Sequence, residues 1–356
     1  MLLRLSINSS FTFSRALAAS SLIAATVIAD PAAALNIIPG WDSSVTSLAN
    51  ASVVQNAFSA VANDYARSFS NPVNVYFNVS WGKVAGQALP SNAVGASSTN
   101  LYGYFSYAQV RSLLTSAAAS SPANTALATA VSNLPAATPP GVSKYVIASA
   151  EAKALGIVSA TQSSPDGYIG FAGSTSGYSF GTSGAIGSVY DFQTVAAHEI
   201  AEVLGRLSGV DNRNWRTPFD LFRYSAPGTL GYNYRSAAYF SIDGGRTALN
   251  SFNYWSRGGD RGDWATTGTS SDASDAFISR GQRKHISAVD LTALDVLGWG
   301  GANLGNAGGN AGGSPNAIAF ALINPGAVPE PAAWSLMIGG FGLTGAAMRR
   351  RERRAA

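Results

Sequence analysis

The amino-acid sequence predicts an α+β fold, on the strength of three segments with clear periodicity. Residues 52–67 carry apolar side chains at helical spacing, and residues 73–79 then alternate apolar and polar side chains like a half-buried strand. A second apolar helical stripe runs through residues 196–207. We therefore expect a mixed N-terminal sheet and a central helix, either as one two-lobed domain or as two small ones.

Other segments carry local start and stop signals for further elements. Capping and proline signals place helices around Ser121-Pro122 and after Ser287, where Asp290 completes a capping box. Asp191 is the expected N-cap of the central helix. The expected elements are helices at 107–118, 122–134, 149–155 and 291–297, strands at 144–148 and 168–171, and a hairpin at 239–252 that turns at Asp243-Gly244-Gly245.

The two ends of the chain differ from the 35–299 domain. Arg4 and Arg15 precede an apolar run that ends in small residues at 32–34, which predicts a secretory signal over 1–34 and a signal peptidase as partner. Removing both ends leaves 16 basic and 17 acidic residues (23 − 7 and 19 − 2), so the formal charge of +4 becomes about −1 and indicates no nucleic-acid partner. Cysteine is absent, so the domain folds without disulfides.

The central helix carries a pair of residues with metal-ligand spacing. His198 and Glu202 stand at i and i+4, so an imidazole nitrogen and a carboxylate oxygen project in the same direction and can reach one cation. Glu199 lies about 100° round the helix, where a general base toward metal-activated water would stand. The same pattern also occurs on ordinary solvated helix faces.

The expected zinc motif is H-E-x-x-H, and this sequence has Glu202 in place of the second His. A second anionic ligand makes the metal a weaker Lewis acid, which lowers the expected activity. Asp220 is our preferred third ligand, with pairing to Arg223 or turn capping as the alternative, and Asp211 is a weaker choice. The site predicts one zinc ion, although another divalent ion also fits these ligands.

Other polar residues in the sequence have simpler roles than catalysis. His285 stands in a basic stretch and is expected at the surface. The Gly- and Asp-rich loop at 258–263 admits calcium, but its spacing matches no known calcium loop, so we expect turn capping there. A serine hydrolase is disfavoured because each of the two histidines has a simpler account than that of a catalytic base. We expect Tyr168, Ile169, Gly170 and Phe171 to form an edge strand that binds a peptide substrate by strand addition.

The C-terminal region resembles a known sorting signal. Residues 300–328 form a Gly/Asn/Ala-rich linker, and Pro329-Glu330-Pro331 with Trp334 precedes an apolar segment at 332–348 and an arginine cluster. This tail in 329–356 resembles the PEP-CTERM signal of Gram-negative bacteria. The resemblance implies an exosortase partner, transient membrane anchoring through 332–348, and then a cell-surface or extracellular location.

Four motifs together resemble a family of PEP-CTERM-linked predicted metalloproteases related to metzincins. They lie at His198–Arg206, Thr217–Ser225, Tyr239–Gly245 and Leu294–Trp299. Gly205 matches the glycine of the extended metzincin motif, and Ser208 stands where that motif has its third ligand. The resemblance implies a zincin-like fold with His198, Glu199 and Glu202 at the active site of an exported zinc endopeptidase that acts on peptide or protein substrates.

Two other functions remain open at this point. One is a catalytically inactive zincin-like protein that binds a surface or a biofilm matrix. The other is a carbohydrate-binding module, for which the evidence would be five aromatic residues, although scattered aromatics are more often part of the core. These residues are Trp215, Tyr224, Tyr232, Tyr234 and Trp255.

Overall fold

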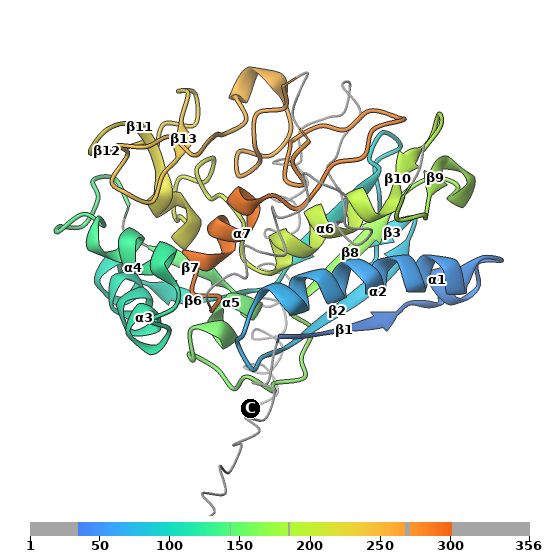
Figure 1. The fold of residues 1–356 in the computed structure, drawn as a ribbon, viewed down its shortest axis with the longest axis horizontal. Coiled ribbons are helices and arrows are strands. Elements are labelled where there is room, and N and C mark those ends of the chain that lie inside the picture. The colour runs from blue at the N-terminus through green and yellow to red at the C-terminus, as the bar shows by residue number, and fades with distance from the viewer. Residues whose placement is uncertain (1–34, 143, 184–185, 268–270, 301–356) are drawn as a thin grey trace, which may run out of the picture. The chain divides into compact units, whose positions relative to one another are not determined.

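The N-terminal part of the protein is built on a four-stranded sheet with the order β1-β2-β8-β5 (Figure 1). The computed structural model describes residues 35–142, 144–183, 186–267 and 271–300. The three strands β1, β2 and β8 run parallel, whereas β5 is antiparallel to β8, so the predicted mixed sheet is confirmed. The strands span Asn36–Trp41 (β1), Asn74–Trp81 (β2), Gly167–Phe171 (β8) and Gly95–Thr99 (β5).

Two helices pack together against this sheet, α2 (Ala51–Ser68) and α6 (Phe192–Val203) (Figure 1). α2 follows the periodicity predicted for 52–67 and connects β1 to β2. The alternation predicted for β2 holds for Val75 to Val79, where Val75, Phe77 and Val79 are buried and Asn78 is exposed, but Ser80 is buried as well. The aromatic ring of Phe58 on α2 meets Phe77 edge-on at 6.3 Å, which fixes the helix to the strand by dispersion and burial.

The close approach of α6 to the sheet depends on glycine. A Cβ atom added at Gly167 of β8 would lie 2.6 Å from Cγ1 of Val203 and 3.1 Å from the backbone oxygen of Ser98. Any side chain at this position would therefore push α6 away from the strand. Because Val203 follows Glu202 directly, the packing at Gly167 also sets the position of the last turn of α6.

We expect Gly167→Ala to lower the free energy of unfolding by about 1–3 kcal/mol, because the added methyl overpacks the contact with Val203. The cost of Gly167→Ala should be smaller in a Val203→Ala background, where the contacting Cγ atoms are absent. Urea unfolding of the parent, both single variants and the double variant measures this coupling. Strictly additive changes would contradict the proposed contact.

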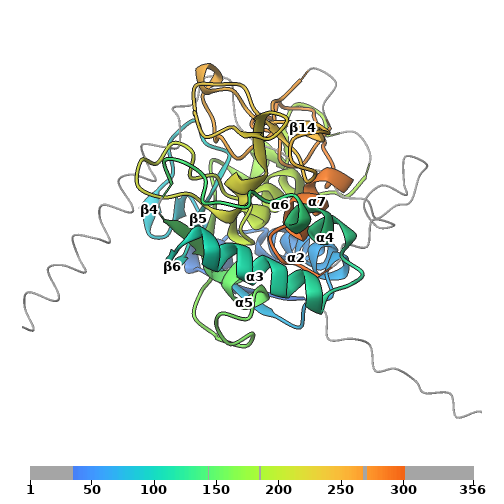
Figure 2. The same cartoon turned by 90° about the vertical axis from the view of Figure 1, so that its left-hand side faces the viewer.

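Helices α3 (Tyr107–Ser120) and α4 (Thr125–Ser132) pack against each other, and Figure 2 shows them side by side. The predicted start of α4 is wrong: the cap is Asn124, not Ser121. Its side chain accepts a hydrogen bond from the Leu127 amide at 2.8 Å. The Asn124 amide also donates to the Trp299 carbonyl at 2.8 Å, so a contact with the end of the domain selects the later cap.

The C-terminal half adds a second four-stranded sheet in the order β12-β11-β13-β14. The predicted hairpin is confirmed as β13 (Tyr239–Phe240) and β14 (Asn250–Ser251), which are shorter than expected. The predicted last helix is α7 (Ala288–Asp295), and its Ser287–Asp290 capping box is present. This half includes η2 (Pro218–Phe222), β11 (Arg223–Ala226), β12 (Thr229–Leu230) and η3 (Trp255–Arg257).

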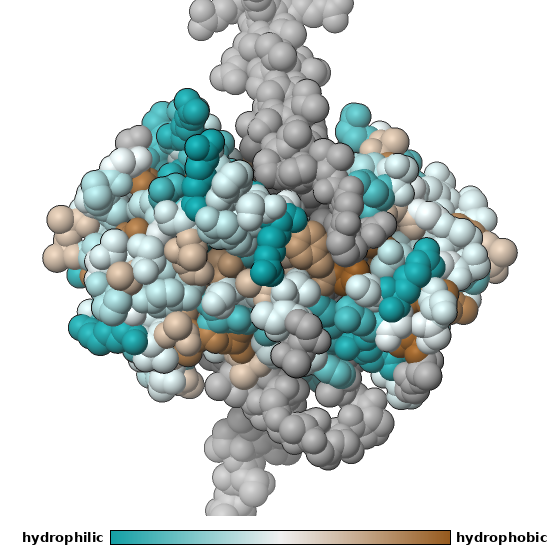
Figure 3. Space-filling model, turned by 90° about the horizontal axis from the view of Figure 1, so that it is seen from above, coloured by the Kyte–Doolittle hydropathy of each residue, from teal (hydrophilic) through white to brown (hydrophobic). Residues whose placement is uncertain are grey.

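Short elements complete the described chain. The pair β6–β7 confirms the strand predicted at 144–148, and α5 confirms the helix predicted at 149–155. Seen from above, the described surface is mostly hydrophilic, with hydrophobic residues in smaller areas (Figure 3). The remaining elements are α1 (Ser43–Thr46), β3 (Lys83–Val84), β4 (Gln87–Ala88), β6 (Leu101–Phe105), β7 (Tyr145–Ala148), α5 (Ser149–Ala154), η1 (Thr175–Gly177), β9 (Tyr178–Ser179) and β10 (Tyr190–Asp191).

Candidate metal centre

The α6 helix begins at the predicted N-cap. The Asp191 carboxylate accepts hydrogen bonds from the amide of Thr194 at 3.2 Å and from its hydroxyl at 2.5 Å. Arg283 approaches the same carboxylate at 3.1 Å. The helix ends before Gly205, whose positive φ of 116° a residue with a side chain would rarely adopt. Both ends of the helix are therefore set by local sequence.

Every residue of α6 is buried, including its polar face. His198 is 6% exposed and Glu202 is 2% exposed, because the C-terminal half of the chain covers them. Two buried ionisable side chains one helical turn apart need compensating partners. The partners of His198 and Glu202 include residues of the loop that precedes α7.

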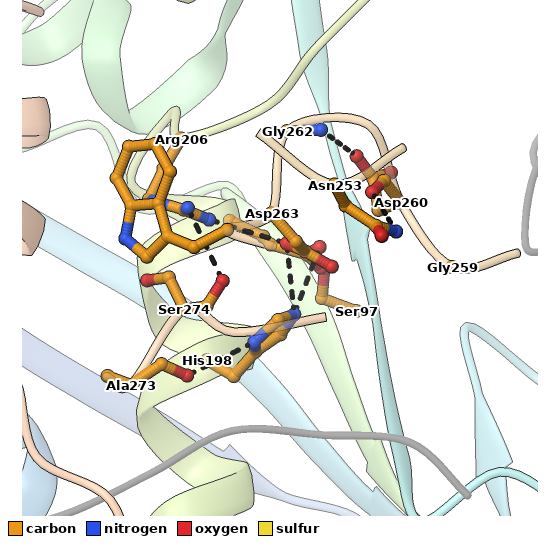
Figure 4. A network of polar contacts seen from close by, with 12 residues as sticks. Ser97, His198, Arg206, Asn253, Gly259, Asp260, Gly262, Asp263, Ala273 and Ser274 are labelled. Carbon is orange, nitrogen blue, oxygen red and sulfur yellow. Dashed lines mark hydrogen bonds and ion pairs between the residues drawn. The ribbon is translucent and has the colours of Figure 1, made fainter. Parts of the chain in front are cut away.

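A third acid completes a compact group with these two residues. Asp263 Oδ1 lies 3.5 Å from His198 Nε2, and Glu202 Oε1 lies 3.6 Å from the same nitrogen. One donor atom from each residue falls within 4.8 Å of the others. Figure 4 shows the His198 ring between the Asp263 carboxylate and the carbonyl of Ala273. We call His198, Glu202 and Asp263 the acid–His cluster.

Outer contacts orient all three side chains of the acid–His cluster. His198 Nδ1 lies 3.3 Å from the Ala273 carbonyl, and a proton on Nδ1 that is donated to this oxygen leaves the Nε2 lone pair facing the two acids. The Ser97 hydroxyl of β5 donates to Glu202 Oε2 at 2.5 Å. Arg206 Nη1 lies 3.4 Å from Asp263 Oδ1, and its guanidinium stacks on Trp264 at 4.4 Å.

The cluster has strongly coupled charges. Burial alone would lower the pKa of His198, but the negative charges of Asp263, Glu202 and Glu199 together raise it well above its ordinary 6.5. Burial raises the pKa of Asp263 despite the nearby His198 and Arg206 charges. Burial raises the pKa of Glu202, but its hydrogen bond and its attraction to His198 outweigh this effect, so the pKa is lowered. In the absence of metal the imidazole therefore holds a proton between two acids.

The donor set fits a divalent cation. Ligands on bonds of about 2.1 Å around a tetrahedral zinc ion lie about 3.4 Å apart. The measured separations of 3.5 Å and 3.6 Å from His198 Nε2 are close to that value. Once His198 gives up its proton to bind a metal, Glu199, Glu202 and Asp263 carry three negative charges against one positive charge on Arg206, a net of −2 that a divalent ion would neutralise.

Glu199, the predicted general base, is 3% exposed on the same helix. A Cβ atom added at Gly95 of β5 would lie 3.0 Å from its Oε1, so the carboxylate lies against the edge strand of the main sheet. Its charge also contributes to the raised pKa of His198. Glu199 is thus beside the acid–His cluster and next to β5.

Asp220, the preferred third ligand from the sequence, is not part of the acid–His cluster. Its carboxylate accepts hydrogen bonds from the Ser208 hydroxyl at 2.6 Å and from the Gly209 amide at 2.8 Å. It also caps η2 through the amide of Thr217. The alternative of turn capping is the one observed, because these neutral donors already satisfy the buried charge.

Asp211 and His285 also lie outside the acid–His cluster. The Asp211 carboxylate is 3.7 Å from Arg261 Nε, and His285 is exposed as predicted. The loop that carries Asp263 is expected from the sequence to hold turn-capping acids, and Asp260 does cap a turn through Gly262. In the sequence, the only hint that Asp263 would be buried is that a large aromatic residue, Trp264, follows it directly. The Trp264 side chain is fully buried in the structure.

The prediction that Tyr168 to Phe171 form an edge strand is wrong. These residues lie in β8, which pairs with β2 on one side and β5 on the other. Their backbone groups are already used in the sheet, so they cannot accept a further strand. The edge position belongs to β5, whose Gly-Ala-Ser-Ser-Thr sequence has no apolar alternation to reveal it.

Glu151 on α5 lies under the end of α6 and is fully buried. A Cβ atom at Gly205 would be 3.0 Å from its Oε2. Burial raises the pKa of Glu151 well above its ordinary 4.5, and the backbone amide of Ala148 offsets this effect only in part. The fold therefore favours the neutral acid.

When folding raises the pKa of an acid, the folded state binds its proton more tightly than the unfolded state does. The protein is then most stable below the unfolded pKa of that acid, and this stability is lost as pH rises through the folded pKa. We expect Glu151→Gln, which stays neutral, to raise Tm relative to the parent at about pH 7. The gain should vanish as pH falls below the unfolded pKa of about 4.5. Thermal unfolding across this pH range measures it, and a Tm difference independent of pH would contradict the argument.

Comparison with known proteins identifies one segment of the chain. Residues 327–351 match the PEP-CTERM protein-sorting motif. This motif implies recognition by an exosortase at the C terminus and indicates a secreted, cell-surface or extracellular protein. No curated protein and no solved structure matches the chain. Within residues 35–300 as described, no helix is long and apolar enough to cross a membrane, and the predicted span at 332–348 lies outside them.

Proposed function

We propose that this protein is an exported metal-dependent endopeptidase, with zinc as the expected ion. The observation that carries the proposal is the convergence of His198 Nε2 with the carboxylates of Glu202 and Asp263 within 4.8 Å. The Ala273 carbonyl at 3.3 Å from His198 Nδ1 is the kind of outer partner that a metal-binding histidine usually has. The proposed ligands are His198, Glu202 and Asp263.

The edge strand β5 supports a peptide as the substrate. Its outer side pairs with no other strand among the described residues, and it lies against α6. An extended peptide could add to this edge through backbone hydrogen bonds, with its bonds near Glu199. A parallel sheet with one antiparallel edge strand beside the metal helix also resembles the zincin-like arrangement, which we include in the proposal.

Each residue near the metal centre would have its own role in peptide hydrolysis. When bound, the metal ion would act as a Lewis acid toward the water and the scissile carbonyl. Glu199 would accept a proton as the water oxygen bonds to the carbonyl carbon, and would return it to the amine nitrogen as the C–N bond breaks. Ser97 and Arg206 would hold Glu202 and Asp263 in place.

A specific observation also favours a second function, a catalytically inactive surface- or matrix-binding protein. The raised pKa of His198 allows a protonated imidazole to sit between Glu202 and Asp263 with no metal present. Arg206 adds a second positive charge at Asp263. The cluster could therefore serve as a buried ion network that stabilises a fold without turnover.

Metal content tests the proposed ligands, and cleavage of a protein substrate separates the two functions if zinc is bound. We would measure metal content by elemental mass spectrometry on the full chain, purified without chelator or His-tag, beside Asp263→Asn and Asp220→Asn. The proposal expects about one zinc ion per chain in the parent and in Asp220→Asn, and none in Asp263→Asn. His198→Ala and Glu202→Ala should also lose the ion.

Metal-free parent protein after dialysis against zinc would favour the inactive protein. Loss of metal in Asp220→Asn but not in Asp263→Asn would show that the ligand assignment is wrong. Binding should release the His198 proton, so metal affinity should fall as pH decreases.

A further inference from the structure

A solvent-open pocket lies away from the acid–His cluster and shares no residue with it. Its volume is about 470 Å³, and it is lined by the 210–213 segment, Arg216, the 232–234 segment and Arg261. The size is that of a small-ligand site. We call it the arginine pocket.

The arginine pocket carries excess positive charge. Arg213, Arg216 and Arg261 contribute three positive charges against one negative charge on Asp211, a net of +2. Arg216 and Arg261 are 8% and 7% exposed, so neither is an ordinary solvated surface arginine. Asp211 Oδ2 lies 3.7 Å from Arg261 Nε, which is a long approach for an ion pair.

Backbone carbonyls hold both buried guanidinium groups in place but do not neutralise them. Arg216 donates to the carbonyls of Gly209 at 3.1 Å and Trp215 at 2.9 Å. Arg261 donates to the carbonyls of Gly259 at 2.9 Å and Trp255 at 3.1 Å. In the described part of the chain, the Nε atom of each arginine has no hydrogen-bond partner. Fixed, under-compensated guanidinium groups are suited to a planar carboxylate.

Aromatic rings and amides supply the rest of the lining. Tyr232 has its hydroxyl tied to Tyr145 at 3.2 Å, which fixes its ring, and Tyr234 is 37% exposed. The Arg235 guanidinium lies over both Tyr234 at 5.3 Å and Trp255 at 5.7 Å, next to the pocket. Flat aromatic faces accept the C–H surfaces of sugar rings, and the Asn212 side chain in the lining can bond hydroxyl groups.

We propose that the arginine pocket binds a uronic-acid unit of an acidic polysaccharide. The guanidinium groups take the carboxylate, the exposed Tyr234 takes the sugar ring, and the amide side chains take the hydroxyls. Of the five aromatic residues that the sequence offered for sugar binding, Tyr232 and Tyr234 line this pocket, whereas Tyr224 belongs to the core. This binding does not depend on the metal centre or on peptidase activity.

The test titrates the full chain with an oligogalacturonate by isothermal calorimetry at low and high salt. Arg213→Glu and Tyr234→Ala change exposed pocket residues, and each should weaken binding by about tenfold because one charge contact or one ring contact is lost. Arg111→Glu, an exposed arginine of α3 outside the pocket lining, is the matched control and should bind like the parent. High salt should weaken binding to the parent.

A neutral oligosaccharide of equal length and poly-glutamate separate the ligand classes. The proposal expects neither to match the oligogalacturonate. No binding of oligogalacturonate at low salt would overturn the proposal, as would equal affinity for the neutral sugar or for poly-glutamate. Unchanged affinity in both pocket variants would also overturn it, because the binding would then lie elsewhere.

Discussion

Replacing Glu199 with glutamine is expected to slow cleavage of an unfolded protein substrate by about 10²–10⁴-fold, the usual contribution of a positioned general base. Glutamine keeps the size of the side chain but cannot accept the proton. Because Glu199 is not one of the three proposed ligands, the zinc content should remain that of the parent. Cleavage rates and elemental analysis on the same preparations measure the two effects.

Glu151→Gln is the matched control for this experiment. It makes the same Glu-to-Gln change on the neighbouring helix α5. The Glu151 side chain is also buried, with 0% exposure, but lies outside the acid–His cluster. Cleavage by this variant should equal that of the parent. If the parent and Glu199→Gln cleave equally slowly while both hold zinc, catalysis by this site is wrong, although the metal centre would stand.

Lys153→Met is expected to lower the free energy of unfolding by about 3–5 kcal/mol, because it leaves a buried carboxylate without its cation. Lys153 Nζ lies 2.6 Å from Asp166 Oδ2, and both side chains are 0% exposed. The lysine also donates to the Asn74 carbonyl at 3.0 Å, and Asp166 accepts from the Tyr76 amide at 2.9 Å. The pair therefore fixes α5 to β2.

The exposed pair Lys83–Asp42 provides the comparison. Its atoms approach to 2.9 Å, but the two side chains are 36% and 35% exposed. We expect Lys83→Met to cost less than about 1 kcal/mol, since water already solvates both charges. Removing both buried charges, in Lys153→Met with Asp166→Asn, should recover part of the loss. Equal losses in the two lysine variants on urea unfolding would contradict the role of burial.

Several features could be predicted from the sequence because they depend on near neighbours in the chain. The helix at 52–67, the strand of β2 and the Asp191 cap follow from periodicity and capping. The i, i+4 spacing of His198 and Glu202 follows from helix geometry alone. The sorting motif at 327–351 is equally local, since a short segment carries it.

Other features were decided by tertiary structure. Asp263 lies in a loop 57 positions after its partner Arg206 in the sequence. No periodic pattern in that loop predicts that its carboxylate belongs to the site. Asp220, which has the more suggestive sequence context, is satisfied by Ser208 and Gly209 instead. The pairing of β5 with β8 likewise made the predicted edge strand an inner one.

The α6 helix, its N-cap and the direction in which His198 and Glu202 project follow from local sequence, because bonds within about one helical turn control these features. Only the tertiary structure shows that the polar face of α6 is buried as well and which third acid it meets. The sequence pattern indicated a polar face, yet all twelve residues of the helix are buried. Burial made these charges require partners, and the fold of the distant loop supplied Asp263.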